Sequence, residues 1–548
     1  MSSPNFNPAD STDWLDAVFG RVHRLLSNQA LAIGVSLAIV ALGLVGQLNT
    51  MVIPDVGWYL HSAERYLDGG TLYRDIFIEV NPPLGFFLTL PAVVIARITG
   101  FPPTEIFAVY VYAILAVSLA AVWRLLSADR SLSNEQRNGL ILLIAIVYVI
   151  GPGNQFGQRE HFLILLSLPY LVAYATHSTG QTVPRGALFL IGVAAGTGLA
   201  LKPHYLLVPF ALEVYRVARG GRLLDIPRAL YLGIAFSLIV YGVVLVTVTP
   251  DYLTRILPYA LEVYNVAYRN PLWINLLRFE TIALPLGMIL HIATRPQQRA
   301  PWTGDIFFIA SVSLFVAYVV QMKGWDYHLY PASSCLLLAY GALFLECLEV
   351  KSAKWAAASK PAIRRGIAAW SLGLIILLSV LDALRLGYKS PFTEIMAPYV
   401  DRYAPNGAIA IFGSNVWPGF PLVNYKDVRW SSRFPTLWLL PGTISNQDAQ
   451  APESGSIGVE MLAFTRDSVV GDFMADMPDL VVVDNRPEKS YFGGLPFDYL
   501  EFFQEDERFA RIWSEYVWVG EVVEFAVYRR NCAPYCDKVS QLNTRPMD

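Results

Sequence analysis

Long apolar runs recur along the first 390 residues, and they constrain the fold of this chain more than any other feature. A helix needs about 20 such residues to cross a bilayer. Only 16% of the 548 residues are charged, whereas soluble domains carry roughly 25%. The sequence therefore predicts a polytopic α-helical membrane protein. About eleven spans are predicted, at 30–49, 103–125, 138–152, 161–177, 186–201, 203–217, 229–249, 271–294, 304–322, 327–348 and 366–388.

Positive charge gives the predicted orientation, because cytoplasmic loops of membrane proteins are enriched in Lys and Arg. Basic residues alternate from loop to loop only if segment 82–100 does not cross, and Pro91 in its middle weakens it as a straight span. One set of loops then holds Arg21, Arg24, Arg124, Arg130, Arg137, Arg185, Arg216, Arg219, Arg222, Arg228, Arg295, Arg299, Lys351, Lys354, Lys360, Arg364 and Arg365. We expect an inner (plasma) membrane protein with a cytoplasmic N-terminus and a retained first span.

From about residue 389 the composition becomes that of a globular domain. Residues 408–413 and 479–484 are typical of buried strands, and 515–529 of a hairpin. The Gly/Ser/Asn-rich segment 442–458 is expected to be a loop. The predicted organisation is a cytoplasmic segment (1–29), a transmembrane module (30–388, with a first outer loop at 50–102) and an extracytoplasmic α/β domain (389–548).

Cysteine and charge content narrow the function classes. Cys335 and Cys347 lie within an apolar run, whereas Cys532 and Cys536 could form a disulfide only in an oxidising compartment. The net charge is −3 and no basic block occurs, so a nucleic-acid partner is not expected.

The predicted orientation places unusual ionisable residues on the outer side: Asp55, Arg159 with Glu160, Lys202 with His204, and the segment 323–328. Ionisable groups at membrane depth are costly, and they usually face a bundle interior or a wet cavity. We therefore expect one polar cavity at this face. On residue type alone, Asp55 is a helix cap, since Asp is favoured at that position.

The first outer loop carries an ordered pattern: Asp55, Tyr59, Ala63, Gly69-Gly70, Tyr73 and Pro82-Pro83-Leu84. This pattern resembles the first outer loop of the membrane glycosyltransferases of the C-type (GT-C) superfold. That group includes protein O-mannosyltransferases, lipid A aminoarabinose transferases and the catalytic subunit of oligosaccharyltransferase. The resemblance covers residues 30–125 and extends in span pattern to about residue 390. Two departures are Val56, where many relatives have a second acidic residue, and Glu160, where they usually have Asp.

The resemblance implies a membrane glycosyltransferase, either hexosyl or pentosyl, that acts at the extracytoplasmic face. Such an enzyme moves a sugar from a polyprenyl-phosphate donor in the membrane lipids to a glycan, lipid or protein acceptor of the cell envelope. Asp55 is then the expected general base, with Glu160 as the second catalytic carboxylate. Lys202, Arg159 and His204 are the expected ligands of the donor phosphate. Direct displacement would invert the anomeric carbon.

Further candidates for sugar or acceptor binding are Trp58, Tyr59, His61, Trp325, Asp326, His328 and Tyr330. The alternative for the aromatic residues is an interfacial belt. Glu160 could instead pair with Arg159 or orient Lys202. No cofactor is certain, but Asp55 and Glu160 are candidate ligands for a divalent cation.

The main rival class is a transporter or flippase of lipid-linked or small polar substrates. It predicts internal repeats and broken helices near the bilayer midplane. No convincing repeat is found, and the polar residues cluster at the ends of the predicted helices.

Overall fold

The computed structural model describes residues 10–177, 183–223, 227–294, 303–348, 361–449 and 457–531. The chain divides into two compact units. The first is made of 1–51, 105–243 and 270–388, and the second of 52–104, 244–269 and 389–548. The first outer loop and segment 244–269 thus belong to the same unit as the C-terminal domain. The side of the membrane on which each part lies remains a prediction.

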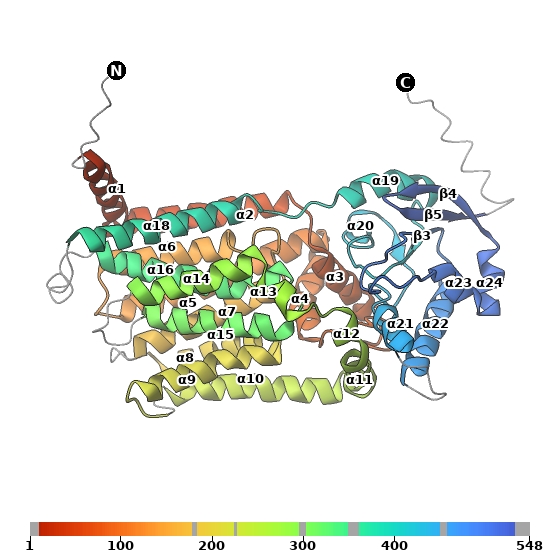
Figure 1. Ribbon diagram of the computed structural model, residues 1–548, viewed down its shortest axis with the longest axis horizontal. Coiled ribbons are helices and arrows are strands. Elements are labelled where there is room, and N and C mark those ends of the chain that lie inside the picture. The colour runs from red at the N-terminus through yellow and green to blue at the C-terminus, as the bar shows by residue number, and fades with distance from the viewer. Residues whose placement is uncertain are drawn as a thin grey trace, which may run out of the picture. The chain divides into compact units, whose positions relative to one another are not determined.

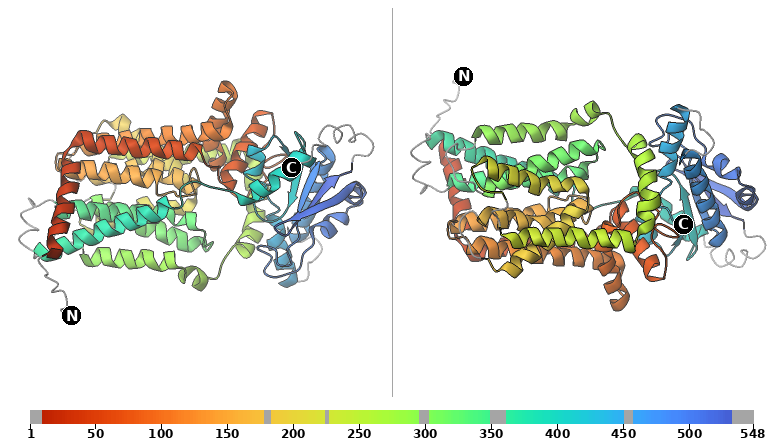
Figure 2. Two further views of the ribbon diagram at one scale, coloured as in Figure 1. Left: turned by 90° about the horizontal axis from the view of Figure 1, so that it is seen from above. Right: turned by 90° about the horizontal axis from the view of Figure 1, so that it is seen from below.

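Long helices running alongside one another make up most of the first unit, and α1 crosses their ends (Figures 1 and 2). The helices and short turns of this unit are α1 (Asp10–Ser27), α2 (Gln29–Leu48), α5 (Pro103–Ala128), α6 (Asn134–Val149), α7 (Arg159–His177), α8 (Arg185–Ala200), η1 (Pro203–Leu206), α9 (Leu207–Ala218), α10 (Arg228–Thr247), α13 (Leu272–Leu276), α14 (Phe279–Thr294), α15 (Thr303–Gln321), η4 (Asp326–His328), α16 (Tyr330–Leu348) and α18 (Pro361–Ala383).

Six of the described helices are long and apolar enough to cross a membrane: α2, α5, α10, α15, α16 and α18. Of the other predicted spans, α7 has 19 residues but is not apolar enough, and the rest are shorter or interrupted. The run at 271–294 is broken into α13 and α14, and the run at 203–217 begins with the single turn η1. The chain is therefore a multi-span membrane protein, and the number of eleven spans remains a prediction.

Small residues allow α8 and α10 to approach closely. A Cβ on Gly192 would lie 2.2 Å from the Leu230 carbonyl oxygen, and one on Gly233 would lie 2.2 Å from that of Phe189. Membrane helices commonly pack through such small residues, because the bilayer supplies no hydrophobic drive between apolar helices. These glycines therefore fix the α8–α10 pair.

The second unit contains helices from three parts of the chain. They are α3 (Pro54–Leu67), α4 (Leu84–Thr99), η2 (Tyr252–Ile256), α11 (Leu257–Tyr259), η3 (Ala260–Tyr264), α12 (Asn265–Ala267), α19 (Pro391–Tyr403), α20 (Leu422–Tyr425), α21 (Leu439–Ala449), α22 (Ile457–Ala475), α23 (Tyr499–Gln504) and α24 (Glu507–Trp513). Helix α4 coincides with the segment expected not to cross; it packs on α3 and ends at Gly100, whose φ of 76° stops the helix.

A five-stranded sheet forms the core of the C-terminal domain, in the order β2-β1-β3-β5-β4. Strands β3, β4 and β5 are labelled in Figure 1. Strands β1 (Ala408–Phe412), β2 (Arg429–Trp430) and β3 (Leu480–Asp484) are parallel, with Ile409 opposite Leu480. Strand β5 (Phe525–Arg530) runs antiparallel to β3 and forms a hairpin with β4 (Tyr516–Val522). Strands β1 and β3 are buried along their whole length, as expected for central strands.

The strands predicted at 408–413 and 479–484 and the hairpin at 515–529 are confirmed. The loop expected at 442–458 is wrong for its first part, where α21 continues to Ala449. Cys335 and Cys347 are buried free cysteines, as predicted. Cys532 and Cys536 lie outside the described residues.

Candidate active site

Arg159 and Glu160 begin α7, directly after a glycine-containing turn. Gly157 has a φ of 75°, which favours glycine, and its N–H donates to Nδ1 of His161 at 3.1 Å. His161 is fully buried, with Nε2 2.9 Å from the Tyr148 carbonyl oxygen. The turn and this histidine together fix the position of the two charged residues. Both are buried, Glu160 with only 1% exposure.

Lys202 lies between α8 and η1, with an extended backbone because Pro203 follows it. Its ammonium donates to three groups from three different elements. The distances are 2.6 Å to Oε1 of Glu160, 2.9 Å to Oε1 of Gln321 and 2.7 Å to Nε2 of His328. An ammonium has three hydrogens, so these contacts match its donor capacity. The Lys202 side chain is 12% exposed, whereas that of Glu160 is 1% exposed.

Glu160 is held from two sides. Its Oε1 accepts from Lys202 and, at 3.0 Å, from the hydroxyl of Tyr205 in η1. Among the described residues, Oε2 has no hydrogen-bond partner, and the same holds for Nδ1 of His328 and Nε2 of His204. The close ion pair of Glu160 is thus with Lys202, which supports the orienting role considered above over simple pairing with Arg159.

Positive charge dominates this cluster. Arg159, Lys202 and Lys323 all act electrostatically on His328, as does His204, whereas Glu160 contributes one negative charge. Cationic side chains from several parts of the chain thus act on one buried histidine beside Lys202, in a largely buried setting. Such a setting favours a phosphate group, since cations act more strongly where water is excluded.

The segment before α16 supplies an aromatic wall. Trp325 and Tyr327 stack with their ring centroids 5.7 Å apart, and the Lys202 ammonium lies 5.9 Å from the centroid of Tyr327. Asp326 is exposed and pairs with Arg278. Tyr330 is buried, and its hydroxyl donates to the Val147 carbonyl oxygen at 3.0 Å. Of the four candidates on this segment, His328 contacts the ammonium directly.

Asp55 belongs to the second unit, in the first turn of α3. The N-cap of α3 is Ile53 and Pro54 follows it, so the cap interpretation of Asp55 is wrong in position. A half-buried carboxylate in the first turn is still stabilised by the helix dipole. Asp55 therefore lies in the first turn of α3, and its catalytic role remains a prediction.

The other candidates of the first outer loop differ in exposure. Trp58 and Tyr59 are buried, and Trp58 stacks on Phe77 with centroids 5.8 Å apart. His61 is half-buried; desolvation lowers its pKa to about 3, with a smaller contribution from Arg65. The ring of His61 is therefore neutral at physiological pH, while Trp58 and Tyr59 stabilise the core of the second unit.

The residues around Glu160 do not fit a divalent cation. Its Oε1 faces an ammonium, and Arg159 and Lys202 both act on its charge. Within the described ranges, no group of three or more His, Cys, Asp or Glu side chains could hold a metal ion. A divalent cation prefers several oxygen ligands, and cationic neighbours would repel it.

Two residues of the cluster were not singled out by the sequence. Gln321 ends α15, and Tyr205 follows the Lys-Pro-His turn. Both lie within two residues of a motif that the sequence did single out; Lys323 belonged to such a motif but had no assigned role. Polar residues at the end of an apolar helix are the signal that could have identified Gln321.

The helical first unit, helices α3 and α4 and the small sheet domain make up a fold that resembles that of a C-type membrane glycosyltransferase of known structure. One solved structure with this fold is that of ArnT from Cupriavidus metallidurans, bound to undecaprenyl phosphate. The match has a TM-score of 0.51 and 12% identity, and covers 92% of this chain and 98% of that chain.

A weaker match is the cryo-EM structure of the arabinofuranosyltransferase AftD from Mycobacteria, with a TM-score of 0.46 and 14% identity. It covers 92% of this chain and 40% of AftD. No protein family model and no curated protein sequence matches the chain.

Proposed function

We propose that this protein is a glycosyltransferase that moves a sugar from a polyprenyl-phosphate donor to an acceptor at the extracytoplasmic face of the membrane. The observation that carries the proposal is the buried, positively charged cluster around Lys202, in a chain with the fold of ArnT. The first outer loop supports it independently, because its ordered residues resemble those of the C-type enzymes. The donor class is suggested by the undecaprenyl phosphate bound to ArnT.

In the proposed reaction, an acceptor hydroxyl oxygen forms a bond to the anomeric carbon while the bond from that carbon to the phosphate oxygen breaks. Asp55 takes the hydroxyl proton as general base. The electron pair of the broken bond leaves with the polyprenyl phosphate. A single displacement of this kind inverts the anomeric carbon.

The Lys202 cluster is the proposed site of the departing phosphate. Lys202, Arg159 and Lys323 would stabilise the negative charge that develops on it. The Lys202 ammonium already donates to three protein acceptors, so a phosphate oxygen must replace one of these acceptors. Gln321 is neutral and has the longest distance, 2.9 Å, so we expect the phosphate oxygen to replace Gln321. Glu160 then acts as a positioning residue that keeps Lys202 charged and in place.

The test is sugar transfer by purified full-length protein in lipid nanodiscs, supplied with radiolabelled polyprenyl-phosphate sugars and an envelope extract as acceptor. Asp55→Asn and Lys202→Met should each lower transfer by at least 100-fold, a typical effect of removing one catalytic group. Asp75→Asn is the matched control in the same outer loop: Asp75 is exposed, and its Oδ2 accepts from Thr71 N–H at 3.1 Å, which an amide oxygen can also do.

Transfer that survives Asp55→Asn would remove Asp55 as the base. Wild-type protein that binds the donors but releases sugar from none of them would refute glycosyl transfer and favour the transporter class.

A further inference from the structure

A short segment, residues 322–324, connects two residues that contact the Lys202 ammonium. Gln321 precedes this segment, and His328 follows it in η4. The backbone of the segment is unusual, because Met322 has a φ of 52°. Residues with a side chain are strained in this left-handed region, and such a conformation persists only where surrounding contacts hold it. Contacts from another part of the chain are therefore expected to hold the segment.

Asn270 and Arg278 provide these contacts. The N–H of Asn270 donates to the Met322 carbonyl oxygen at 2.8 Å, and its side-chain amide donates to that of Lys323 at 2.9 Å. The Arg278 guanidinium donates to the carbonyl oxygen of Gly324. All three carbonyl groups of the segment are thus bonded to these two residues, and the segment cannot turn without breaking at least one of these bonds.

Helix α13 lies between these two residues in the chain. Its four apolar residues are between 40% and 63% exposed, whereas Asn275 is 3% exposed. This distribution is the reverse of that in a soluble protein, and it fits a helix whose apolar side chains contact lipid. A Cβ on Gly324 would lie 2.4 Å from Oδ1 of Asn275. The buried polar residue of α13 therefore packs against the 322–324 segment.

The segment brings a positive charge to the Lys202 cluster. Lys323 is 7% exposed and acts electrostatically on His328, which accepts from Lys202 at 2.7 Å. A displacement of the segment would move Lys323 and His328 relative to Lys202. Because the attraction between a cation and a phosphate falls with distance, the position of this segment affects how strongly the cluster binds a phosphate group.

We propose that Asn270 and Arg278 are positioning residues of the phosphate site, which keep Lys323 and His328 at the Lys202 cluster. The inference rests on the proposed function, and it concerns the binding of the donor phosphate. Both residues act through main-chain carbonyl groups, so neither needs to touch the phosphate. A purely structural role would lower the amount of folded protein without changing the affinity of the folded molecules, and this difference makes the inference testable.

The first test is binding of undecaprenyl phosphate to the full-length protein in detergent micelles, measured by native mass spectrometry. Asn270→Ala removes a neutral hydrogen bond without changing the net charge, and it should weaken binding about 3- to 10-fold. Asn138→Ala is the matched control in the same unit. Asn138 is 2% exposed, and its amide also donates to a main-chain oxygen, that of Leu26 at 2.7 Å. This control should leave the affinity unchanged.

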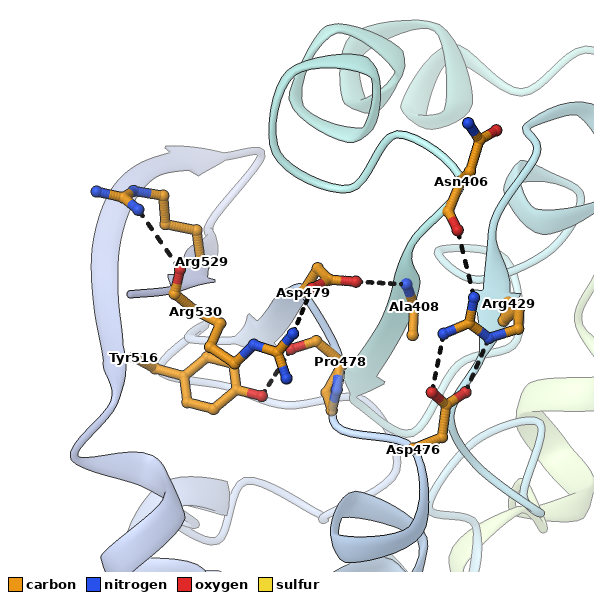
Figure 3. Close-up of polar contacts among 9 residues, drawn as sticks. All are labelled: Asn406, Ala408, Arg429, Asp476, Pro478, Asp479, Tyr516, Arg529 and Arg530. Atoms are coloured by element: carbon orange, nitrogen blue, oxygen red, sulfur yellow. Dashed lines mark hydrogen bonds and ion pairs between the residues drawn. The ribbon is translucent and has the colours of Figure 1, made fainter. Parts of the chain in front are cut away.

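Arg278→Met is the second variant, and it should weaken binding at least as much as Asn270→Ala. Its matched control is Arg429→Met in the second unit. Arg429 likewise binds one carboxylate, that of Asp476, and one main-chain oxygen, that of Asn406 (Figure 3). An equal loss of affinity in Arg429→Met would show that any arginine held in this way has the same effect, and would overturn the inference.

A double variant tests whether Asn270 acts through Lys323. Lys323→Met should itself weaken binding of undecaprenyl phosphate, because it removes a cation of the cluster. In the Lys323→Met background, Asn270→Ala should have a smaller effect on the affinity than in the wild type. Equal fold-changes in the two backgrounds would mean that the two residues act independently, which contradicts the positioning role.

Binding and transfer can fail separately. Unchanged affinity in both Asn270→Ala and Arg278→Met, or a wild type that does not bind undecaprenyl phosphate, would overturn the positioning role, whatever the transfer assay shows. Where transfer occurs, Asn270→Ala should raise the donor KM. A lower kcat with an unchanged donor KM would indicate only a loss of folded protein and would count against the inference. A wild type that binds undecaprenyl phosphate but transfers no sugar would refute the proposed function, and the positioning role is then decided by the affinities alone.

Discussion

The ion pair between Lys202 and Glu160 allows a quantitative prediction about stability. The two charged atoms lie 2.6 Å apart, with side-chain exposures of 12% and 1%. At an effective dielectric constant of about 20, Coulomb's law gives roughly 6 kcal/mol of attraction. The cost of desolvating the two charges offsets most of this attraction. A single substitution therefore measures the cost of leaving the other charge buried without its partner, about 3–5 kcal/mol.

Each single substitution removes the closest partner of a buried charge. Lys202→Met leaves Glu160 with the hydroxyl of Tyr205 as its remaining side-chain donor among the contacts described. Glu160→Gln leaves Lys202 with two neutral acceptors, Gln321 and His328. Both should therefore be destabilising, and the double variant should cost less than the sum of the singles by about 2–3 kcal/mol.

The assay is thermal unfolding of the detergent-solubilised protein, followed by a thiol-reactive or intrinsic fluorescence signal. At roughly 2 °C per kcal/mol, each single variant should lower Tm by about 6–10 °C. The control is Arg508→Met, because Arg508 also lies 2.6 Å from a carboxylate, that of Asp506, but is 50% exposed. Exposed pairs contribute about 0–1 kcal/mol, so its Tm should change little.

Strictly additive effects of the two substitutions would refute the reasoning, since they would mean that the two charges do not depend on each other.

Two further predictions concern packing and pH. Gly233→Ala should separate α8 from α10 and lower Tm by several °C, because a Cβ there would lie 2.2 Å from the Phe189 carbonyl oxygen. The control is Gly242→Ala on the same helix, where a Cβ would meet nothing within 4 Å, so this variant should not lower Tm. Equal Tm values for the two variants would exclude the close contact. His61 is neutral in the folded protein, with a pKa of about 3, while in the unfolded chain it takes up a proton below about 6.5. The contribution of neutral His61 to the free energy of unfolding is therefore complete above pH 6.5 and falls as the pH is lowered, by at most about 2 kcal/mol at pH 5. Unfolding of the wild type and of His61→Gln, measured at pH 7 and pH 5, should show that the wild type loses more stability. Parallel pH profiles of the two proteins would contradict this prediction.

The sequence by itself determined the membrane class, the buried strands and the hairpin. Those features depend on local periodicity: apolar runs of span length, the continuous apolar strands 408–412 and 480–484, and the alternation before the C-terminus. It also singled out Glu160, Lys202 and His328 individually, because ionisable residues at the ends of apolar helices are rare.

Only the tertiary structure decided which of these residues act together. The ammonium of Lys202 joins Glu160, Gln321 and His328 from elements separated by 42 to 126 residues, and no local pattern encodes such contacts. The same holds for Asp326 and Tyr330, which share a motif with His328 but have partners elsewhere, Arg278 and Val147.

Asp55 illustrates the difference between what the sequence shows and what only the structure shows. Its place in an ordered loop pattern was readable from the chain, but its position one residue after Pro54, inside the helix and not at its cap, required backbone geometry. The partners of α3 required still more, since Gly57 and Arg65 bond to residues 367 positions later, Asn424 and Ser432. Local sequence fixes periodicity and helix ends, whereas long-range packing selects the partners of each buried polar group.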